Sequence, residues 1–339
     1  MLDVVNLVIY GAVASAISFF VILLLMPAVI KSLAAKGRAV PDAHKRDKPM
    51  IPRPAGPVIM AGIAAAEIAL YLLTMNTAVL AVLLSTAIAF VVGYIDDSRT
   101  MPGWFKPVAL LAAAVPIIVL DLYVGGVHGD FLNLVFGRAF IPLLYVPLIL
   151  VIIPITGNTI NSIDVLNGVA SGFIIIATIP LLASIAIFGS HEVFLAALPL
   201  LFAAIAFYKY HKFPSRIFPG DSGTLLLGAM YGALAIAGSS EIIGVIALLP
   251  AVMNSFLFLA SVKRIVEHRQ VKARPTILTA NFKLAASADR AAPVTLVRLI
   301  VADGPLGEKE IGHKIFKLAT FTALLAFASI VIQYVILRL

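Results

Sequence analysis

The sequence contains no cysteine, and it has few charged residues. Asp, Glu, Lys and Arg make up 12% of the 339 residues, against about 25% in an ordinary soluble domain. Without cysteine there is no disulfide, no thiolate nucleophile and no cysteine-ligated metal. The shortage of charge, with a hydrophobic share of 61%, excludes a soluble globular enzyme and a disordered chain. The class that remains is the polytopic membrane protein.

Ten apolar runs follow one another along the chain, most of them long enough to cross a bilayer. They are residues 5–30, 57–74, 77–95, 107–124, 139–157, 166–188, 193–208, 223–239, 241–262 and 317–337. We therefore predict an all-α polytopic membrane protein of about ten transmembrane helices, forming a single domain over residues 1–339. The stretch 263–316 is too long for a simple connector, and its modest polar–apolar alternation predicts a small α/β insert.

Basic residues are concentrated in alternate loops. All Lys and Arg except Arg138 and Arg338 fall in 31–56, 96–106, 158–165, 209–222 and 263–317. The positive-inside rule makes this set of loops cytoplasmic, so both termini are expected outside. In the opposite set, residues 125–138 are half apolar, which predicts an external hairpin or an interfacial segment.

Most of the unusual polar residues also lie in the cytoplasmic loops. An enzyme that meets a soluble substrate at the membrane face would have this distribution, whereas a transporter more often places polar residues near the bilayer midplane. The exception is Glu67, near the middle of the second run. An intramembrane carboxylate is a functional candidate, but a protonated or internally hydrogen-bonded glutamate explains it as well.

The loop GYIDDSRTMPGWFK, residues 93–106, places two adjacent carboxylates at the end of an apolar helix. Asp96 and Asp97 repel each other there and are costly to keep ionised unless a cation shares the site. Lys106 follows Asp96 by ten residues. It is either an interfacial lysine or a partner for a phosphate group.

Two further loops carry polar residues directly beside apolar runs. In NTINSIDVLNG, residues 158–168, the spacing of Asn158, Asn161 and Asp164 would put them on one face of a helical turn. In FPSRIFPGDSGT, residues 213–224, glycines flank Asp221 and allow close approach of a ligand. Helix capping would explain one such residue by itself. Phe218 could pack in the core or stack on a flat ring.

Two basic segments complete the cytoplasmic set. PDAHKRDKPMIPRPAG, residues 41–56, is either a segment near anionic lipid or a phosphate-binding loop. KRIVEHRQVKARPT, residues 263–276, includes His268, Arg269 and Arg274. A solvated basic run is the ordinary interpretation, but a phosphate-rich substrate that meets carboxylates elsewhere needs such cations, and arginine suits that role.

The sequence has no Walker loop, no dinucleotide fingerprint and no Ser-His-Asp order. Carboxylate and amide oxygens suit Mg²⁺, or Mn²⁺, which typically serves the phosphates of a substrate. Phosphoryl transfer needs mainly positioning and neutralisation of charge. An acceptor drawn from the bilayer would explain the membrane location. The residues therefore predict a Mg²⁺-dependent phosphotransferase that joins a soluble phosphate donor to a lipid, with no nucleic acid as partner.

Four segments along the chain resemble, in their order, the motifs of the polyprenyl-phosphate N-acetylhexosamine-1-phosphate transferase family. They are PDAHKRDKPMIPRPAG, GYIDDSRTMPGWFK, NTINSIDVLNG and FPSRIFPGDSGT. This family includes the bacterial phospho-MurNAc-pentapeptide translocase and the eukaryotic dolichyl-phosphate GlcNAc-1-phosphotransferase. FPSRIFPGDSG and the helical MNSFLF at 253–258 are similar to the dolichyl-type enzymes. The histidine-rich motif of the muramoyl enzymes is missing from the last loop. Asp164 follows the bacterial pattern instead, and Arg53 departs from both.

The resemblance implies transfer of GlcNAc-1-phosphate from UDP-GlcNAc to a polyprenyl (dolichyl-type) phosphate, with release of UMP. It implies that the lipid tail lies in a groove between helices at the cytoplasmic leaflet. It also implies that Asp221 and Asn161 are Mg²⁺ ligands and that Asp96 and Asp97 have an organising or basic role. Lys106 and Arg274, assisted by Arg269 or His268, would bind phosphates. Asn167 and Phe218 would bind the uracil, and Asn158 would contact substrate.

Three alternatives stay open. The donor could be UDP-MurNAc-pentapeptide or another UDP-N-acetylhexosamine. The protein could be a secondary transporter or flippase, in which Glu67 rather than Asp221 would be essential. A family member could also bind lipid-linked intermediates without turnover, although Asp96, Asp97, Asn161 and Asp221 are all present. The resemblance also allows a homodimer.

Overall fold

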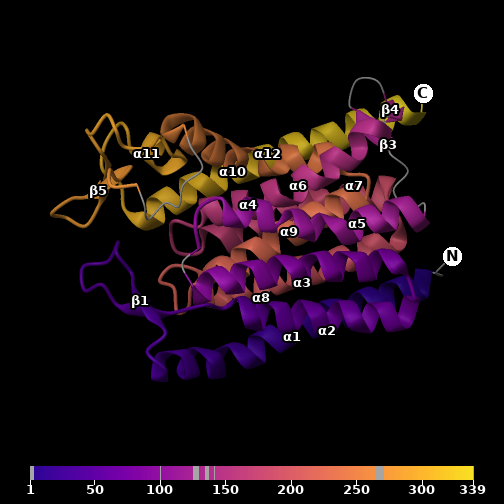
Figure 1. The fold of residues 1–339 in the computed structure, drawn as a ribbon, viewed down its shortest axis with the longest axis horizontal. Helices are drawn as coiled ribbons and strands as arrows, with labels where there is room; N and C mark the ends of the chain where they lie inside the picture. The colour runs from indigo at the N-terminus through magenta and orange to yellow at the C-terminus, as the bar shows by residue number, and fades with distance from the viewer. Residues whose placement is uncertain are drawn as a thin grey trace.

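The protein is a bundle of roughly parallel and antiparallel helices that run between two ends (Figure 1). The computed structural model describes residues 4–99, 101–124, 130–133, 137–140, 142–263 and 271–338. Both termini lie at one end with β3 and β4, and the opposite end carries β1, β5 and α11 (Figure 1). This arrangement agrees with the two sets of loops that the charge distribution separates.

Each predicted apolar run corresponds to helix. Within the described residues, eight helices are long and apolar enough to cross a membrane. They are α1 (Val4–Ala35), α2 (Gly56–Thr74), α3 (Thr77–Ser98), α6 (Pro142–Ile163), α7 (Val169–Phe188), α8 (His191–His211), α10 (Glu241–Val262) and α12 (Glu308–Arg338). The fourth run is divided into α4 (Phe105–Ala109) and α5 (Leu111–Val124), and the eighth forms α9 (Gly220–Ala237). The all-α polytopic prediction is confirmed.

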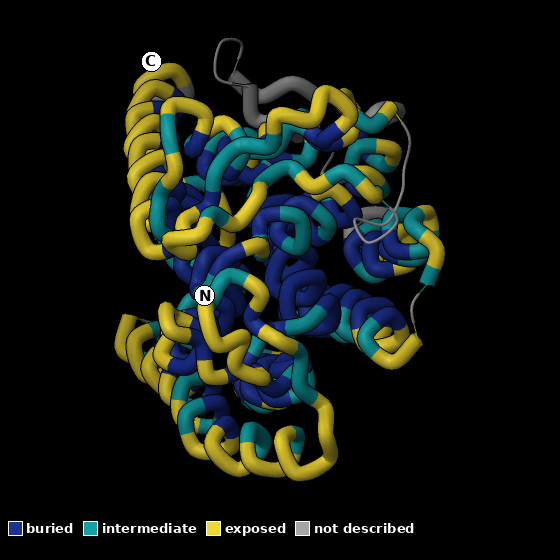
Figure 2. The backbone as a smooth tube through the Cα atoms, turned by 90° about the vertical axis from the view of Figure 1, so that its left-hand side faces the viewer, coloured by how far each residue is buried: buried dark blue, intermediate teal, exposed yellow. Residues whose placement is uncertain are grey.

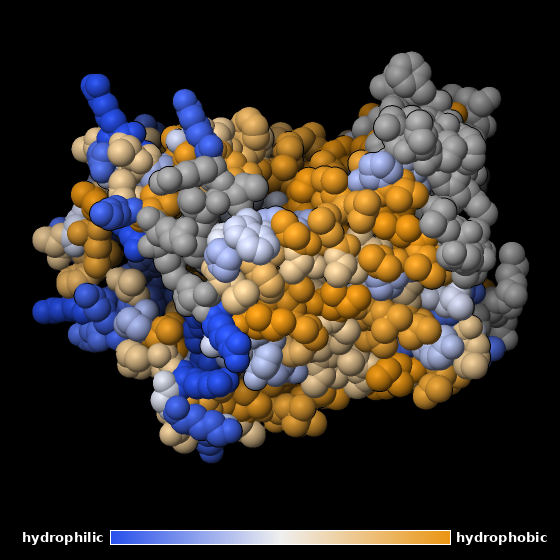
Figure 3. Space-filling view, in the orientation of Figure 1, coloured by the Kyte–Doolittle hydropathy of each residue, from blue (hydrophilic) through white to orange (hydrophobic). Residues whose placement is uncertain are grey.

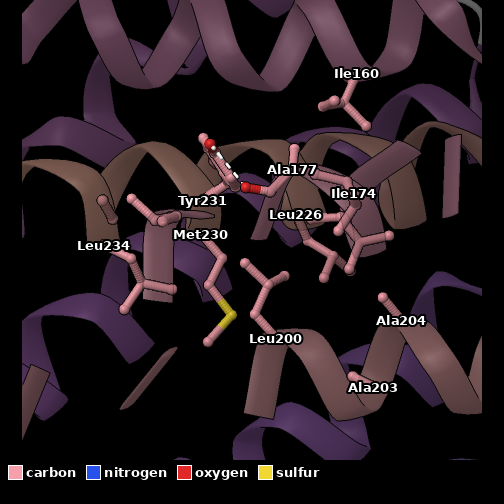
Figure 4. Close-up of a cluster of buried hydrophobic side chains, with 14 of the residues drawn as sticks. Ile160, Ile174, Ala177, Leu200, Ala203, Ala204, Leu226, Met230, Tyr231 and Leu234 are labelled. Carbon is pink, nitrogen blue, oxygen red and sulfur yellow. Dashed lines mark hydrogen bonds between the residues drawn. The ribbon is translucent and has the colours of Figure 1, made fainter. Parts of the chain in front are cut away.

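Helix α9 forms the centre of the bundle. Every residue from Asp221 to Ala237 is buried, as expected for a helix that is apolar on all sides. Figure 4 shows Leu226, Met230, Tyr231 and Leu234 of α9 among side chains of α6, α7 and α8. The Tyr231 hydroxyl donates to the Ala177 carbonyl at 3.4 Å and the Gly244 carbonyl at 3.1 Å. The polar first turn of α9 is therefore anchored by a rigid core.

Three short antiparallel pairs connect the helices. β1 (Ala39–Pro41) pairs with β2 (Met50–Pro52), β3 (Asp130–Asn133) with β4 (Gly137–Phe140), and β5 (Thr276–Leu278) with β6 (Leu284–Ala286). The antiparallel pairing of β3 with β4, over the described residues 130–133 and 137–140, favours the hairpin interpretation of 125–138. With α11 (Leu296–Ile300), the β5–β6 pair forms the expected small α/β insert. Helix α12 begins at Glu308, earlier than its apolar run.

The surface has the distribution expected in a bilayer. Buried segments fill the interior and exposed ones line the outer helices (Figure 2). Hydrophilic residues gather at the β1 and β5 end, while a broad hydrophobic surface covers the helices (Figure 3). Large apolar residues are also exposed along the outer helices, among them Leu24 of α1 and Leu324 of α12. An apolar area of this extent is stable only against lipid or another protein.

Candidate active site

The first turn of α9 is held by Asp97 of α3. Asp97 Oδ1 accepts a hydrogen bond from the Asp221 amide at 2.9 Å, and Oδ2 accepts from the Ser222 amide at 2.9 Å and its hydroxyl at 2.6 Å. The N-cap of α9 is Pro219, which supplies no side-chain cap. The free amides at a helix start need acceptors, so a carboxylate from another helix takes the place of the cap.

Two glycines allow α3 and the start of α9 to approach this closely. Gly220 has φ +71°, and a Cβ there would lie 2.6 Å from Asp97 Oδ2. Gly93 lies one turn before Asp97, and a Cβ there would lie 2.5 Å from the Asp221 carbonyl oxygen. Any side chain at either position would push the two helices apart.

Around Asp221, side chains from four helices converge in a group that we call the Asp221 cluster: Asp96, Lys106, Asn161, Asp221 and Thr224. The Lys106 ammonium lies 3.0 Å from Asp221 Oδ1 and 3.3 Å from Asp96 Oδ2. Asn161 Nδ2 donates to the same Asp221 oxygen at 2.9 Å. Thr224 Oγ1 donates to Asn161 Oδ1 at 2.8 Å. Asp96, Lys106 and Asp221 are each at most 9% exposed.

The charges in this region suit an additional cation. Asp96, Asp97 and Asp221 are three carboxylates, and their ion pairs within the described part of the chain are with two basic residues, Lys106 and Arg53. A buried charge without compensation is costly. Carboxylate and amide oxygens at Asp221 and Asn161 are hard donors of the kind that Mg²⁺ prefers. In this structure the amide nitrogen of Asn161 faces Asp221, but Thr224 can donate or accept and so can hold either amide orientation.

Asp164 follows the end of α6 and lies near the same region. Its Oδ1 is 3.5 Å from His211 Nε2, and His211 Nδ1 lies 2.9 Å from the Ser171 hydroxyl. Burial, reinforced by the negative charge of Asp221, raises the pKa of Asp164 to about 7. Asn158 and Asn161 lie in the last turns of α6, which ends at Ile163 and not at 157 as predicted.

A cavity of about 370 Å³ adjoins the Asp221 cluster between α4, α6 and α10. Its polar lining includes Lys106, Asn158, Asn161 and Ser255. The Ser255 hydroxyl is buried and has no hydrogen-bond partner among the described residues. The rest of the lining is largely apolar, with Pro107, Pro154, Ile155, Val252, Phe256, Phe258 and Leu259. The cavity therefore combines a polar side at the cluster with an apolar wall from membrane helices.

Asn167 lies in a second polar cluster. Its side-chain oxygen accepts from the Ser215 amide at 2.7 Å and from Lys45 Nζ at 3.4 Å, and its Nδ2 donates to Asp42 at 3.1 Å. The backbone N–H of Asn167 donates to Glu308 Oε1 at 2.8 Å. Lys45 also pairs with the carboxylates of Asp42 and Glu308. Asn167 thus ties together the β1–β2 loop, the α8–α9 loop and the start of α12.

The second cluster also contains a group of ligand-type atoms. Side-chain atoms of Asp42, His44 and Glu308 lie within 4.8 Å of one another. Because the Lys45 ammonium already pairs with both carboxylates, these two negative charges are partly balanced. Each of the two groups has one carboxylate more than its basic partners. The Asp221 cluster is the stronger candidate for a metal because Lys106 and Asn161 of this cluster line the adjoining cavity.

The remaining predicted residues are placed as follows. Phe218 is half-buried, and its backbone pairs with the Pro52 carbonyl and the Ala55 amide, each at 3.0 Å. Arg274 is exposed just before β5. His268 and Arg269 lie outside the described residues. Glu67 is fully buried in α2, and neither of its carboxylate oxygens has a hydrogen-bond partner in the described part of the chain.

Several residues at the site were not selected from the sequence. Ser222 and Thr224 follow Asp221 directly in the GDSGT sequence, so this motif itself could have suggested them. Arg53 was noted only as a departure from the family pattern, yet its guanidinium bonds Asp97 at 3.3 Å. Lys45 and Glu308 carry no local signal, because they reach Asn167 from the β1–β2 loop and the start of α12, far apart in the chain.

Comparisons with known proteins give the family of this chain. The family model described as glycosyl transferase family 4 matches residues 79–239. A protein of Saccharolobus solfataricus, named for UDP-N-acetylglucosamine–dolichyl-phosphate N-acetylglucosaminephosphotransferase, is 32% identical over 231 residues, covering 66% of this chain and 69% of that protein. A Bacillus subtilis protein, named for undecaprenyl-phosphate N-acetylglucosaminyl 1-phosphate transferase, is 30% identical, covering 67% of this chain and 62% of that protein.

A third relative carries a different donor in its name. The phospho-N-acetylmuramoyl-pentapeptide-transferase of Caldicellulosiruptor bescii is 30% identical over 238 residues, covering 66% of this chain and 73% of that protein.

The helical bundle and its buried polar end define an integral multi-pass membrane protein. With these matches, the chain belongs to the polyprenyl-phosphate N-acetylhexosamine-1-phosphate transferase family, glycosyl transferase family 4.

Proposed function

We propose that this protein transfers N-acetylglucosamine 1-phosphate from UDP-GlcNAc to a polyprenyl phosphate of the dolichyl type. The observation that carries the proposal is the Asp221 cluster beside a cavity with an apolar wall. In the reaction, an oxygen of the lipid phosphate attacks the sugar-linked phosphorus. The bond from that phosphorus to the bridging oxygen breaks, and UMP leaves with the bond electrons. The products are polyprenyl-diphospho-GlcNAc and UMP.

Asp221 and Asn161 are the residues that would hold Mg²⁺. Their oxygen donors and the shortage of positive charge around them support this assignment. When bound, the ion would neutralise charge on the donor diphosphate, which is the main need of phosphoryl transfer. Mn²⁺ has similar ligand preferences and is expected to substitute.

Asp96 and Asp97 have different roles in this proposal. A phosphate monoester is already anionic near neutral pH, so the acceptor needs little help from a general base. Asp96 pairs with Lys106 and orients it, and Asp97 positions Asp221 by capping α9. Lys106 supplies positive charge to the phosphates. Asp97 is therefore proposed as a positioning residue and not as the base.

The cavity between α4, α6 and α10 is the proposed site of the lipid acceptor. Its polar side at Lys106 and Asn158 suits the phosphate, and its apolar wall at Ile155, Phe256 and Leu259 suits the first isoprene units. The tail would continue into the bilayer between these helices. This placement explains why the enzyme is built from membrane helices.

For the donor nucleotide we propose that Phe218 stacks on the uracil. We propose that Arg274, together with Arg269 or His268, binds the phosphates. Asn167 retains one amide hydrogen for the base, because its oxygen and its other amide hydrogen bond protein groups. We place this site on the cytoplasmic side. The concentration of Lys and Arg at that end of the bundle supports the orientation.

The test is UMP release by purified protein in detergent with polyprenyl phosphate, Mg²⁺ and UDP-GlcNAc. We expect release that requires the lipid, stops with EDTA and falls at least about a hundredfold in Asp221→Asn, with the variant still folded. UDP-MurNAc-pentapeptide and UDP-GalNAc are compared in the same assay, because the relatives differ in donor. Turnover with one of these instead would replace the proposed sugar.

A transporter is the competing class, and Glu67 separates the two. We expect Glu67→Gln to retain most UMP release, since Glu67 lies within α2 and not in the Asp221 cluster. If no UDP-sugar gave UMP with folded protein, and Glu67→Gln abolished substrate flux in liposomes, the transferase proposal would be rejected.

A further inference from the structure

Lys106 occupies an unusual position for a lysine. It lies on the short helix α4 and is 6% exposed. Its ammonium lies 3.0 Å from Asp221 Oδ1 and 3.3 Å from Asp96 Oδ2. A buried lysine is rare without paired anions. Here two carboxylates from different helices share one ammonium.

The contact with Asp221 is the important one. Lys106 and Asn161 bond the same Asp221 oxygen, at 3.0 Å and 2.9 Å. A divalent cation that used this oxygen together with Asn161 would lie next to the ammonium. Like charges at such short separation repel strongly in a buried site. The lysine and the metal therefore compete for the same place.

We propose that Lys106 and the divalent cation are alternative partners of Asp221, and that metal binding displaces the Lys106 ammonium toward the adjoining cavity. Without metal, Lys106 balances one of the two negative charges of Asp96 and Asp221. With metal, its charge is released to face the cavity. The inference rests on the proposed function, because it takes Asp221 as the metal ligand.

The surroundings of Lys106 provide a destination for the displaced charge. Lys106 itself lines the cavity between α4, α6 and α10, beside Asn158, Ser162 and Ser255. An ammonium among these neutral polar groups attracts an anion, and a phosphate monoester is the anion that the proposed acceptor carries. The exchange would thus couple the two sites, because the metal prepares the cavity for the lipid phosphate.

The test measures metal affinity and not turnover. Mn²⁺ binding to purified protein in detergent, without donor or acceptor, is followed by the loss of the free-ion signal in electron paramagnetic resonance. We expect Lys106→Met to bind Mn²⁺ about tenfold more tightly than the wild type. Lys106→Arg keeps the competing charge and should show no such gain. Lys36→Met is the matched control, because Lys36 is exposed at the end of α1.

Unchanged or weaker Mn²⁺ binding by folded Lys106→Met would overturn the exchange. If that variant is not monodisperse, Lys106→Gln, which retains a donor for one aspartate, is measured with the same expectation. Asp221→Asn separates this result from the proposed function. Loss of Mn²⁺ binding in that variant supports the metal site whatever Lys106 does, and undiminished binding would reject the metal site itself. UMP release tests the transferase reaction independently of both.

Discussion

At the scale of single residues, Asp96 and Asp97 show how neighbours in the chain acquire different tasks. Asp96 accepts from Lys106 and from the Met101 amide at 3.1 Å. Asp97 accepts from the first turn of α9 and from Arg53. Successive residues on a helix point about 100° apart. One carboxylate therefore faces the Asp221 cluster and the other faces the backbone of α9.

Replacement of Asp97 tests its positioning role. Asp97→Asn keeps the size of the side chain but loses one acceptor and the ion pair with Arg53, so we expect a loss of about 1–3 kcal/mol of stability together with reduced turnover.

Ser222→Ala removes one hydrogen bond to the same carboxylate and should lower the stability by about 1 kcal/mol. Thermal unfolding in detergent measures both. A variant that melts like the wild type but lacks turnover would instead indicate a chemical role.

Asp164 predicts a pH dependence of stability. The pKa of this carboxyl is about 7 in the folded protein and about 3.9 in an unfolded chain. Between these values the folded state holds a proton that the unfolded state has lost. The contribution of Asp164 to stability therefore falls as the pH rises from about 4 and levels off above about 7.

The variant Asp164→Asn should remove that fall. We expect the melting temperature of the variant minus that of the wild type to increase as the pH rises from about 4.5 to about 7.5, measured with EDTA present. Asp303→Asn, at an exposed position, is the control and should show a constant difference. A constant difference for Asp164→Asn as well would contradict the raised pKa.

At the scale of elements, the site depends on the crossing of α3 and α9. Helices approach this closely in membranes where small residues remove side-chain bulk. Gly93→Ala would place a methyl group 2.5 Å from the Asp221 carbonyl oxygen. We expect a loss of about 1–3 kcal/mol and a marked loss of UMP release, because the clash displaces the turn that carries Asp221.

Gly312→Ala in α12 is the matched control for Gly93→Ala. Its added Cβ would meet Val169 at 3.9 Å, an ordinary contact. Alanine is also the better helix former, so this variant should be as stable as the wild type or slightly more stable. Equal stability and activity of the two variants would show that the α3–α9 crossing is not tight.

At the scale of the whole molecule, the segregation of charge predicts the orientation in the membrane. The absence of native cysteine allows single cysteines to be labelled one at a time. In intact spheroplasts, a membrane-impermeant maleimide should label His191→Cys and leave Lys36→Cys unlabelled until the membrane is opened. Both positions are exposed in the structure. The reverse pattern would place the Asp221 cluster on the outer side.

Much of the architecture follows from local patterns. The apolar runs are helical, apart from the start of the fifth in β4, because burial in lipid requires a backbone whose hydrogen bonds are satisfied internally. A helix provides these bonds within one segment. The boundaries were less well predicted. The fifth apolar run ends at 157, but α6 continues to Ile163 and includes Asn158 and Asn161, whose spacing fits a helical turn. Asparagine at a helix end can stay in the helix where its amide bonds a carbonyl, as Asn158 does with Pro154 at 2.8 Å.

The sequence by itself determined that the protein is a membrane bundle and that its basic residues lie in alternate loops. It also predicts the aspartates and asparagines of the candidate site. These features depend on composition and on spacing within short segments. Only the tertiary structure decided the partners. Lys106 meets Asp221 across 115 residues of chain, and Asn167 meets Glu308 across 141. Such contacts depend on how whole helices pack, and no local pattern of residues contains that information.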